Sequence, residues 1–195
     1  YHASGWVTEI TPAERAAIWW GGVESLARVH RLDWRAAGFE FLDRGEGTPL
    51  ERQLRYYDGY LEWAACGRPQ PIIETAREWL WRNRPAGEPV RLQWGDARIG
   101  NIIFDGTRPA AVLDWAMVTV GSPEADLAWS IFLDRHHSEG IEMPRLEGFP
   151  SYEDTVARYE QLTGHRVQHL HYYQVFAGFR FAVIMLRIAQ QMVHY

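Results

Sequence analysis

Apolar residues recur at helical spacing in the first half of the chain. One set follows Thr11-Pro12-Ala13-Glu14, where a capping threonine, a first-turn proline and a capping-box glutamate are typical of a helix start. The apolar positions of this segment, three or four residues apart, are Trp19, Val23, Leu26 and His30. We therefore predict a helix from about 12 to 31.

Two further amphipathic helices follow a connector at 45–49. The apolar positions of the second helix are Leu50, Leu54, Tyr57, Leu61 and Ala64, and Gly67 and Pro69 should end it. The third helix is predicted from about 71 to 82. Its apolar positions are Ile72, Ala76, Trp79 and Leu80.

The pattern then becomes strand-like. Short apolar runs occupy 90–94, 102–104 and 110–113, and Asp105-Gly106 between the last two is typical of a hairpin turn. This predicts a small β region inside a helical chain.

The remainder of the chain returns to helices. Pro123 should open a helix that runs to about Leu133, and a loop is expected from 135 to 150. Ser151 should cap a helix ending near Gly164, and a long helix or helix pair follows from about 167 to 195. The predicted fold class is α+β, mostly helical, with one small β hairpin in a single domain over 1–195.

Composition disfavours some classes of function. The 195 residues are 47% hydrophobic and carry a formal net charge of −5. This balance lacks the basic excess that nucleic-acid binding requires, so a small-molecule partner is expected instead. The lone Cys66 cannot form an internal disulfide, and we see no signal peptide or uninterrupted membrane-spanning run. We predict a cytoplasmic protein without a membrane partner, and the oligomeric state stays open.

Asp96, Asn101 and Asp114 occur in the stretch LQWGDARIGNIIFDGTRPAAVLDW, residues 92–115, which otherwise consists mainly of apolar residues, glycines and one turn. Asp96 and Asn101 follow an apolar run, and glycines at 95 and 100 loosen the loop between them. The predicted hairpin should return Asp114 to the same place. Two carboxylates and one amide oxygen are better ligands for a hard divalent cation than for a soft metal, and a carboxylate can also activate a hydroxyl. Ordinary turn chemistry of Asp and Asn is the alternative.

The segments GDARIGN, VLDW and SPEADLAW, at this spacing, resemble the aminoglycoside phosphotransferase and choline kinase-like family, relatives of protein kinases. LARVHRLDW at 26–34 is similar to the end of a helix of that family. The resemblance implies the C-terminal lobe of a protein kinase-like fold, with the small hairpin carrying the metal site. It also implies Mg²⁺ as cofactor, ATP as co-substrate and the hydroxyl of a small molecule as phosphoryl acceptor.

The same resemblance implies a role for each residue of the motifs. Asp96 corresponds to the catalytic aspartate that orients the acceptor hydroxyl. Asn101 and Asp114 correspond to the two magnesium ligands, which are also the cofactor-binding residues. Asp126 would support the catalytic loop from the following helix, and Arg98 would either approach phosphate or stabilise that loop.

Two positions depart from the family pattern. Trp94 stands where the family usually has histidine, which removes a ring nitrogen that could pair with backbone near the metal motif and leaves the anchoring of the loop open. Ala116 stands where glutamate is common after the Asp-Trp pair. The family's glycine-rich nucleotide loop and ATP-contacting lysine have no counterpart before Thr11. We therefore expect the N-terminal nucleotide lobe to be absent from this chain, and the chain alone to be inactive.

Three functions are compatible with these residues. The leading hypothesis is ATP-dependent transfer of a phosphoryl group to an alcohol, active only with the N-terminal lobe. The alternative is a non-catalytic binding or regulatory module, which the changes at Trp94 and Ala116 keep open. Metal-dependent hydrolysis at the same carboxylates is a third possibility, disfavoured because no further acidic ligand or histidine lies nearby in sequence.

The acceptor should lie beside Asp96, in a cleft with aromatic walls. The residues expected to line it are Tyr56, Tyr57, Tyr60, Trp63, Tyr172, Tyr173 and Phe176. Such walls suit an apolar, acyl-like or aromatic alcohol, and similar kinase-like domains associated with acyl-CoA dehydrogenases suggest a hydroxyacyl substrate. Trp115 and Trp129 are expected to be core residues and not stacking partners of a ligand.

Overall fold

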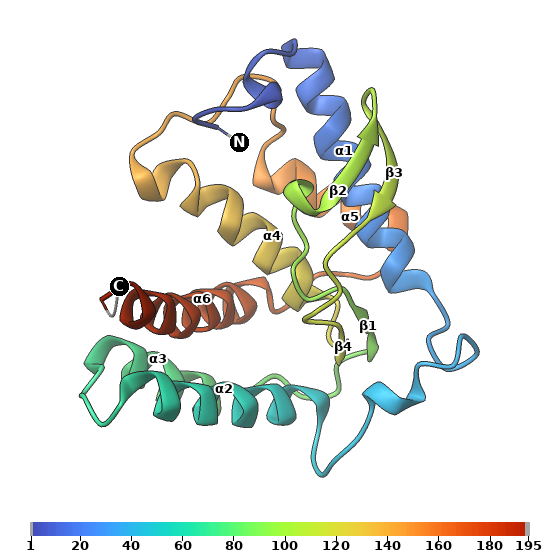
Figure 1. The fold of residues 1–195 in the computed structure, drawn as a ribbon. Helices are drawn as coiled ribbons and strands as arrows, with labels where there is room; N and C mark the ends of the chain where they lie inside the picture. The colour runs from blue at the N-terminus through green and yellow to red at the C-terminus, as the bar shows by residue number, and fades with distance from the viewer. Residues whose placement is uncertain (1, 194–195) are drawn as a thin grey trace.

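The computed structural model describes residues 2–193 and contains six helices and four short strands in the order that Figure 1 shows. The helices are α1 (Pro12–Arg31), α2 (Pro49–Ala65), α3 (Pro71–Arg82), α4 (Glu124–His136), α5 (Tyr152–Thr163) and α6 (Leu170–Val193). The strands are β1 (Arg91–Gln93), β2 (Ile102–Asp105), β3 (Arg108–Val112) and β4 (Thr119–Gly121). The mostly helical α+β class is confirmed.

Local sequence signals set the ends of several helices. The side chain of Thr11 accepts the Glu14 amide while the Glu14 carboxylate accepts the Thr11 amide, and a proline follows the cap. Helix α2 begins with an equivalent capping box at Thr48. Its five predicted apolar positions are all buried. Helix α5 starts at the Ser151 cap and ends at Gly164, which adopts the left-handed conformation, as predicted.

The structure corrects the prediction in two places and decides one alternative that the sequence left open. A strand at 119–121 was missed; β4 pairs antiparallel with β1, placing Leu92 opposite Val120. A three-residue strand has too few alternating positions to be recognised from its own sequence. Helix α3 buries only Leu80 fully, and Ile72 is 87% exposed. The C-terminal segment is one helix through Val193, and 194–195 lie outside the described residues.

Helix α4 lies between two packed halves of the molecule (Figure 1). Helices α2, α3 and α6 form one half, and Ala125 and Ala128 of α4 join its core. Helices α1 and α5 with the β2–β3 hairpin form the other, which Leu127 and Ile131 of α4 join. Because α4 is buried on opposite faces, it can carry polar groups into the centre of the protein.

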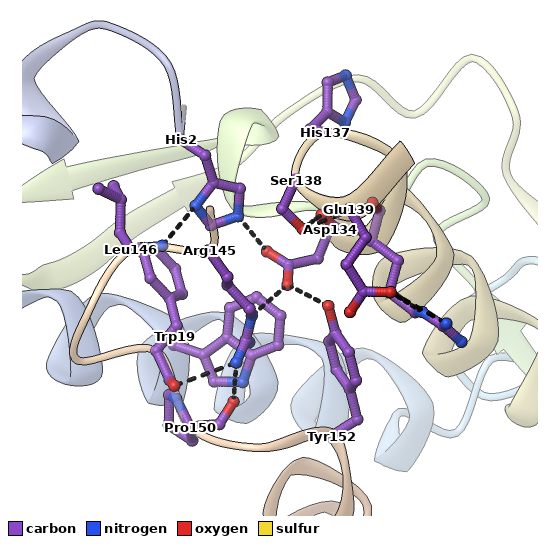
Figure 2. A network of polar contacts seen from close by, with 12 residues as sticks. His2, Trp19, Asp134, His137, Ser138, Glu139, Arg145, Leu146, Pro150 and Tyr152 are labelled. Carbon is purple, nitrogen blue, oxygen red and sulfur yellow. Dashed lines mark hydrogen bonds and ion pairs between the residues drawn. The ribbon is translucent and has the colours of Figure 1, made fainter. Parts of the chain in front are cut away.

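The C-terminal end of α4 is held by a network of polar side chains around Asp134 (Figure 2). Asp134 is fully buried, and its Oδ1 lies 2.9 Å from His2 Nε2. Its Oδ2 accepts hydrogen bonds from Arg145 Nε at 2.7 Å and from the Tyr152 hydroxyl at 2.9 Å. Burial, followed by the charge of Asp134, raises the pKa of Tyr152, so this hydroxyl keeps its proton.

Helix α6 has one property that bears on the membrane prediction. Residues Leu170–Met192 are long and apolar enough to cross a membrane by length and composition alone. In the structure the same helix packs against α2, α3 and α4, and it carries the buried Arg180 toward them. A core helix passes the same compositional test, so the absence of a membrane partner stays a prediction.

Candidate active site

The loop after β1 makes an abrupt turn at Gly95. Its φ is 92°, and a Cβ added there would lie 2.2 Å from the carbonyl oxygen of Met117. Only glycine fits both the left-handed backbone and this close approach. The turn points the next residue, Asp96, toward α4 and the 3-10 turn at Ile99–Asn101.

Asp126, near the start of α4, supports this turn from behind. Its Oδ2 accepts the Trp94 amide at 2.6 Å and its Oδ1 accepts the Gly95 amide at 2.9 Å. The carboxylate is 1% exposed, so these charge-assisted bonds form away from water. Asp126 therefore holds the main chain immediately before Asp96.

Two further residues continue from Asp126 into the core. His30 Nε2 lies 3.1 Å from Asp126 Oδ2, and His30 Nδ1 lies 2.6 Å from the Tyr159 hydroxyl. Burial, followed by the charge of Asp126, raises the pKa of Tyr159, so the phenol remains a donor. The two ring nitrogens of His30 thus connect the Tyr159 hydroxyl to the Asp126 carboxylate.

Three donors orient the Asp96 carboxylate. Trp129 Nε1 donates to Oδ1 at 2.8 Å, while Asn101 Nδ2 and Arg98 Nε donate to Oδ2 at 2.7 and 3.1 Å. The side chain keeps 15% of its surface exposed, so the carboxylate remains accessible to a ligand. Of the two roles expected for Arg98, the structure places it on the loop, against Asp96.

Asp114 lies on the hairpin side of the same loop. Its φ is 57°, a left-handed conformation that aspartate tolerates better than most residues, and the residue is exposed. The Leu113 amide donates to the Asn101 carbonyl at 2.8 Å, which brings Asp114 next to Asn101 as the hairpin spacing predicted. Among the described residues, the Asp114 carboxylate takes part in no hydrogen bond or ion pair.

Trp94 anchors the loop, a point that the sequence left open. Its indole Nε1 donates to the carbonyls of Leu113 and Asp114 at 2.8 and 3.2 Å. The ring is 1% exposed, so the donor is buried. Trp94 thus supplies a ring N–H to the backbone of the metal motif, the contact that the loss of histidine was expected to remove.

The donor set fits Mg²⁺. The Asn101 amide nitrogen is engaged with the Asp96 carboxylate and carbonyl, so its amide oxygen is the atom left for a cation. The Asp114 carboxylate adds hard oxygen ligands, and Mg²⁺ usually binds through few protein groups together with water and phosphates. In the described part of the chain, no cluster of three or more His, Cys, Asp or Glu side chains offers an all-protein metal site.

A cavity of about 560 Å³ opens beside Gly95, between α2, β4 and α6. Tyr56, Tyr57 and Tyr60 line it as predicted, and Ala116 forms part of its wall. The other expected wall residues do not. Trp63 is 55% exposed on the surface, whereas the remaining three belong to the core, namely Tyr172, Tyr173 and Phe176.

Several residues that shape this site were not predicted from the sequence. Trp129 is a core residue as expected, but its N–H also orients Asp96. Trp115, expected in the core, is 38% exposed because it follows Asp114 on the open face. His30 offered one signal, a histidine among the core positions of a helix. Arg180 offered another, a charge within the most apolar helix.

The chain resembles proteins of known family. Residues 3–163 match the sequence model of the phosphotransferase enzyme family. Acyl-CoA dehydrogenase family member 11 of Gallus gallus is 40% identical over 129 residues, 63% of this chain and 16% of that protein. The human protein of the same name is 36% identical over 170 residues, 80% of this chain and 21% of that protein. The chain therefore spans no more than about a fifth of these curated relatives.

Solved structures show the same fold. A Ralstonia eutropha protein provisionally named as an aminoglycoside phosphotransferase superposes with a TM-score of 0.82 at 26% identity, covering 95% of this chain and 59% of that chain. A macrolide 2'-phosphotransferase of Brachybacterium faecium has a TM-score of 0.59 at 18% identity, covering 94% of this chain and 58% of that chain. The second likeness concerns the fold alone.

Proposed function

Because this chain belongs to the phosphotransferase enzyme family, we propose that it is the catalytic lobe of an enzyme that transfers the γ-phosphoryl group of ATP to a hydroxyl of a small molecule. The observation that carries the proposal is the arrangement of Asp96. Its carboxylate is oriented by Trp129 and Asn101, on a loop held by Asp126, with the free carboxylate of Asp114 next to Asn101.

Each residue has a distinct task in the proposed reaction. The Asp96 carboxylate accepts a hydrogen bond from the acceptor hydroxyl and so directs the oxygen lone pair at the phosphorus. Phosphoryl transfer depends mainly on positioning, and the three donors limit the freedom of this carboxylate before substrate binds. The Asn101 oxygen and the Asp114 carboxylate would hold Mg²⁺, which when bound neutralises charge on the phosphates.

We further propose that residues outside these 195 cover the nucleotide. Apolar side chains flank Asp114 on the open face of the hairpin, and Ile103 is 50%, Leu113 46% and Trp115 38% exposed. Such a patch suits contact with a nucleotide base or with a second lobe. Calorimetry with Mg-ATP should give at least tenfold weaker binding to 1–195 than to the longer protein; equal affinity would place the nucleotide elsewhere.

The alternative, a non-catalytic binding module, is favoured by one contact. Arg98 and Asn101 both occupy Asp96 Oδ2, which leaves fewer lone pairs for an acceptor. Arg98 is 40% exposed and forms a short-range pair that a substrate could displace at small cost. The enzyme therefore remains the better account of the site.

One screen separates these functions. The full-length protein is incubated with Mg-ATP and a panel of small alcohols and hydroxyacyl thioesters, and ADP and free phosphate are both measured. Acceptor-dependent ADP release that Asp96→Asn and Asp114→Ala abolish supports the kinase. If no condition releases ADP, the result supports the binding module. Release of free phosphate without an acceptor supports hydrolysis.

A further inference from the structure

Arg180 is a buried cation without a carboxylate partner. The residue is 4% exposed, and no Asp or Glu of the described chain forms an ion pair with it. Its Nε donates to the Tyr57 hydroxyl at 3.2 Å and its Nη2 donates to the Gly95 carbonyl at 3.0 Å. The guanidinium also lies over the Trp129 ring, 4.5 Å from its centroid. Neutral groups alone therefore hold a charge that proteins usually bury only when it is paired.

The cavity that Arg180 lines is biased toward positive charge. Its wall contains three arginines, Arg44, Arg52 and Arg180, and no Asp or Glu. Acidic residues outnumber Lys and Arg in the chain by 25 to 20, so this wall departs from the overall composition. Arg52 pairs with Asp43, which does not line the cavity, whereas Arg44 is exposed.

The rest of the cavity wall is mainly apolar or aromatic, with the polar side chains of Gln53, Gln93 and Thr119 among them. The side chains that contribute the apolar and aromatic surface are Leu42, Tyr56, Tyr60, Met117 and Ile184. Cavities of this kind bind a ligand through apolar contact and use a few polar groups to fix its orientation. A polycationic ligand would meet only like charge here, which costs affinity.

We propose that this cavity binds an acceptor with an anionic head group, a carboxylate or a phosphate, on an apolar body, and that Arg180 and Arg52 recognise the anion. The proposal rests on the proposed function and names its substrate class. Arg180 binds the Gly95 carbonyl, and Gly95 precedes Asp96. The anion and the reacting hydroxyl would therefore sit at neighbouring points of the same loop, and the anion would fix which hydroxyl faces Asp96.

The test is a binding measurement that requires no ATP. Calorimetry on the full-length protein compares four ligands with one alkyl body: 3-hydroxyoctanoate, its methyl ester, 3-hydroxyoctyl phosphate and 3-hydroxyoctylamine. At least one of the two anions should bind at least about tenfold more tightly than the ester, because the ester cannot form the charge-assisted hydrogen bond. The tighter of the two anions identifies the head group, and the amine should bind weakest.

Variants link that preference to the arginines. Arg180→Gln and Arg52→Gln should each remove most of the anion's advantage while leaving the ester's affinity unchanged. Arg82→Gln is the matched control, because this arginine is 73% exposed at the end of α3 and does not line the cavity. If Arg180→Gln fails to fold, Arg52→Gln provides the test. Equal binding of anion and ester, tightest binding of the amine, or no binding at all would overturn the proposal.

The outcome is separable from that of the proposed function. Anion-selective binding without acceptor-dependent ADP release would retain this pocket and reject the kinase. ADP release with the ester as readily as with the acid would retain the kinase and reject the anion pocket.

Discussion

The two ends of α4 carry two buried aspartates with different partners. Asp126 and Asp134 are 1% and 0% exposed. Asp126 accepts two backbone amides of the catalytic loop and lies beside His30. Asp134 contacts side chains instead, those of His2, Arg145 and Tyr152 (Figure 2).

The difference in partners indicates that Asp126 acts in the candidate active site, whereas Asp134 stabilises the fold. A carboxylate that accepts main-chain amides sets the backbone path, so a shift of Asp126 would move Asp96 directly. A carboxylate that binds side chains from distant segments ties those segments together. Asp134 thus fastens residue 2 and the 145–152 segment to the far end of α4, away from Asp96.

The largest effect should follow Asp126→Ala. Removing one partner of a buried ionic network leaves His30 and two amides unsatisfied, which should lower the free energy of unfolding by about 3–5 kcal/mol. Turnover per folded molecule should also fall by about 100-fold or more, since the loop loses its support. Urea unfolding and steady-state ADP release by the full-length protein measure the two quantities. Retained turnover would contradict the assigned role.

Asp134→Ala provides the opposite case at the other end of the helix. The loss of stability should be similar, about 3–5 kcal/mol, because the fully buried Asp134 network is broken and the partly buried Arg145 loses its carboxylate partner. Turnover per folded molecule should change less than threefold. A loss of turnover as large as that of Asp126→Ala would show that the two ends of α4 are not functionally separate.

Gly95→Ala tests the turn that Asp126 supports. The left-handed backbone and the contact with the Met117 carbonyl should together cost about 1–3 kcal/mol and displace Asp96. Gly106→Ala is a control at a positive φ with no atom within 4 Å of the added Cβ. Equal effects on ADP release from both variants would argue against a special role of the turn.

Trp129→Phe removes one donor from Asp96 and keeps an aromatic ring in the core. We expect about 1 kcal/mol of lost stability from the missing hydrogen bond and a fall in kcat of about tenfold with little change in KM. Trp115→Phe, at an exposed ring, should leave stability nearly unchanged. An unaltered kcat in Trp129→Phe would mean that the other donors suffice to orient Asp96.

Tyr152→Phe should give the smallest effect, about 0.5 to 1 kcal/mol, because Asp134 keeps its other partners. The raised pKa of Tyr152 adds a pH dependence. The folded state favours the neutral phenol, so this contribution is fully present below the ordinary tyrosine pKa of about 10 and is lost as pH rises above it. The free energy of unfolding, measured with denaturant from pH 8 to 11, should therefore fall less steeply with pH in Tyr152→Phe than in the parent. Parallel curves would contradict this assignment.

The sequence alone determined the features that depend on neighbouring residues. The starts of α1, α2 and α5 follow from capping residues within four positions of each helix end, and the Asp105-Gly106 turn closes the hairpin. The hairpin in turn brings Asp114 next to Asn101. These interactions are local, so the order of residue types is enough to predict them.

Only the tertiary structure decided the contacts between distant segments. His30 and Asp126 are 96 residues apart, Trp129 reaches Asp96 across 33, and Arg180 reaches Gly95 across 85. Strand β4 likewise exists because β1 lies beside it. Whether a buried polar group finds a partner depends on how helices pack, and packing positions such groups in space without leaving a periodic signal in the sequence.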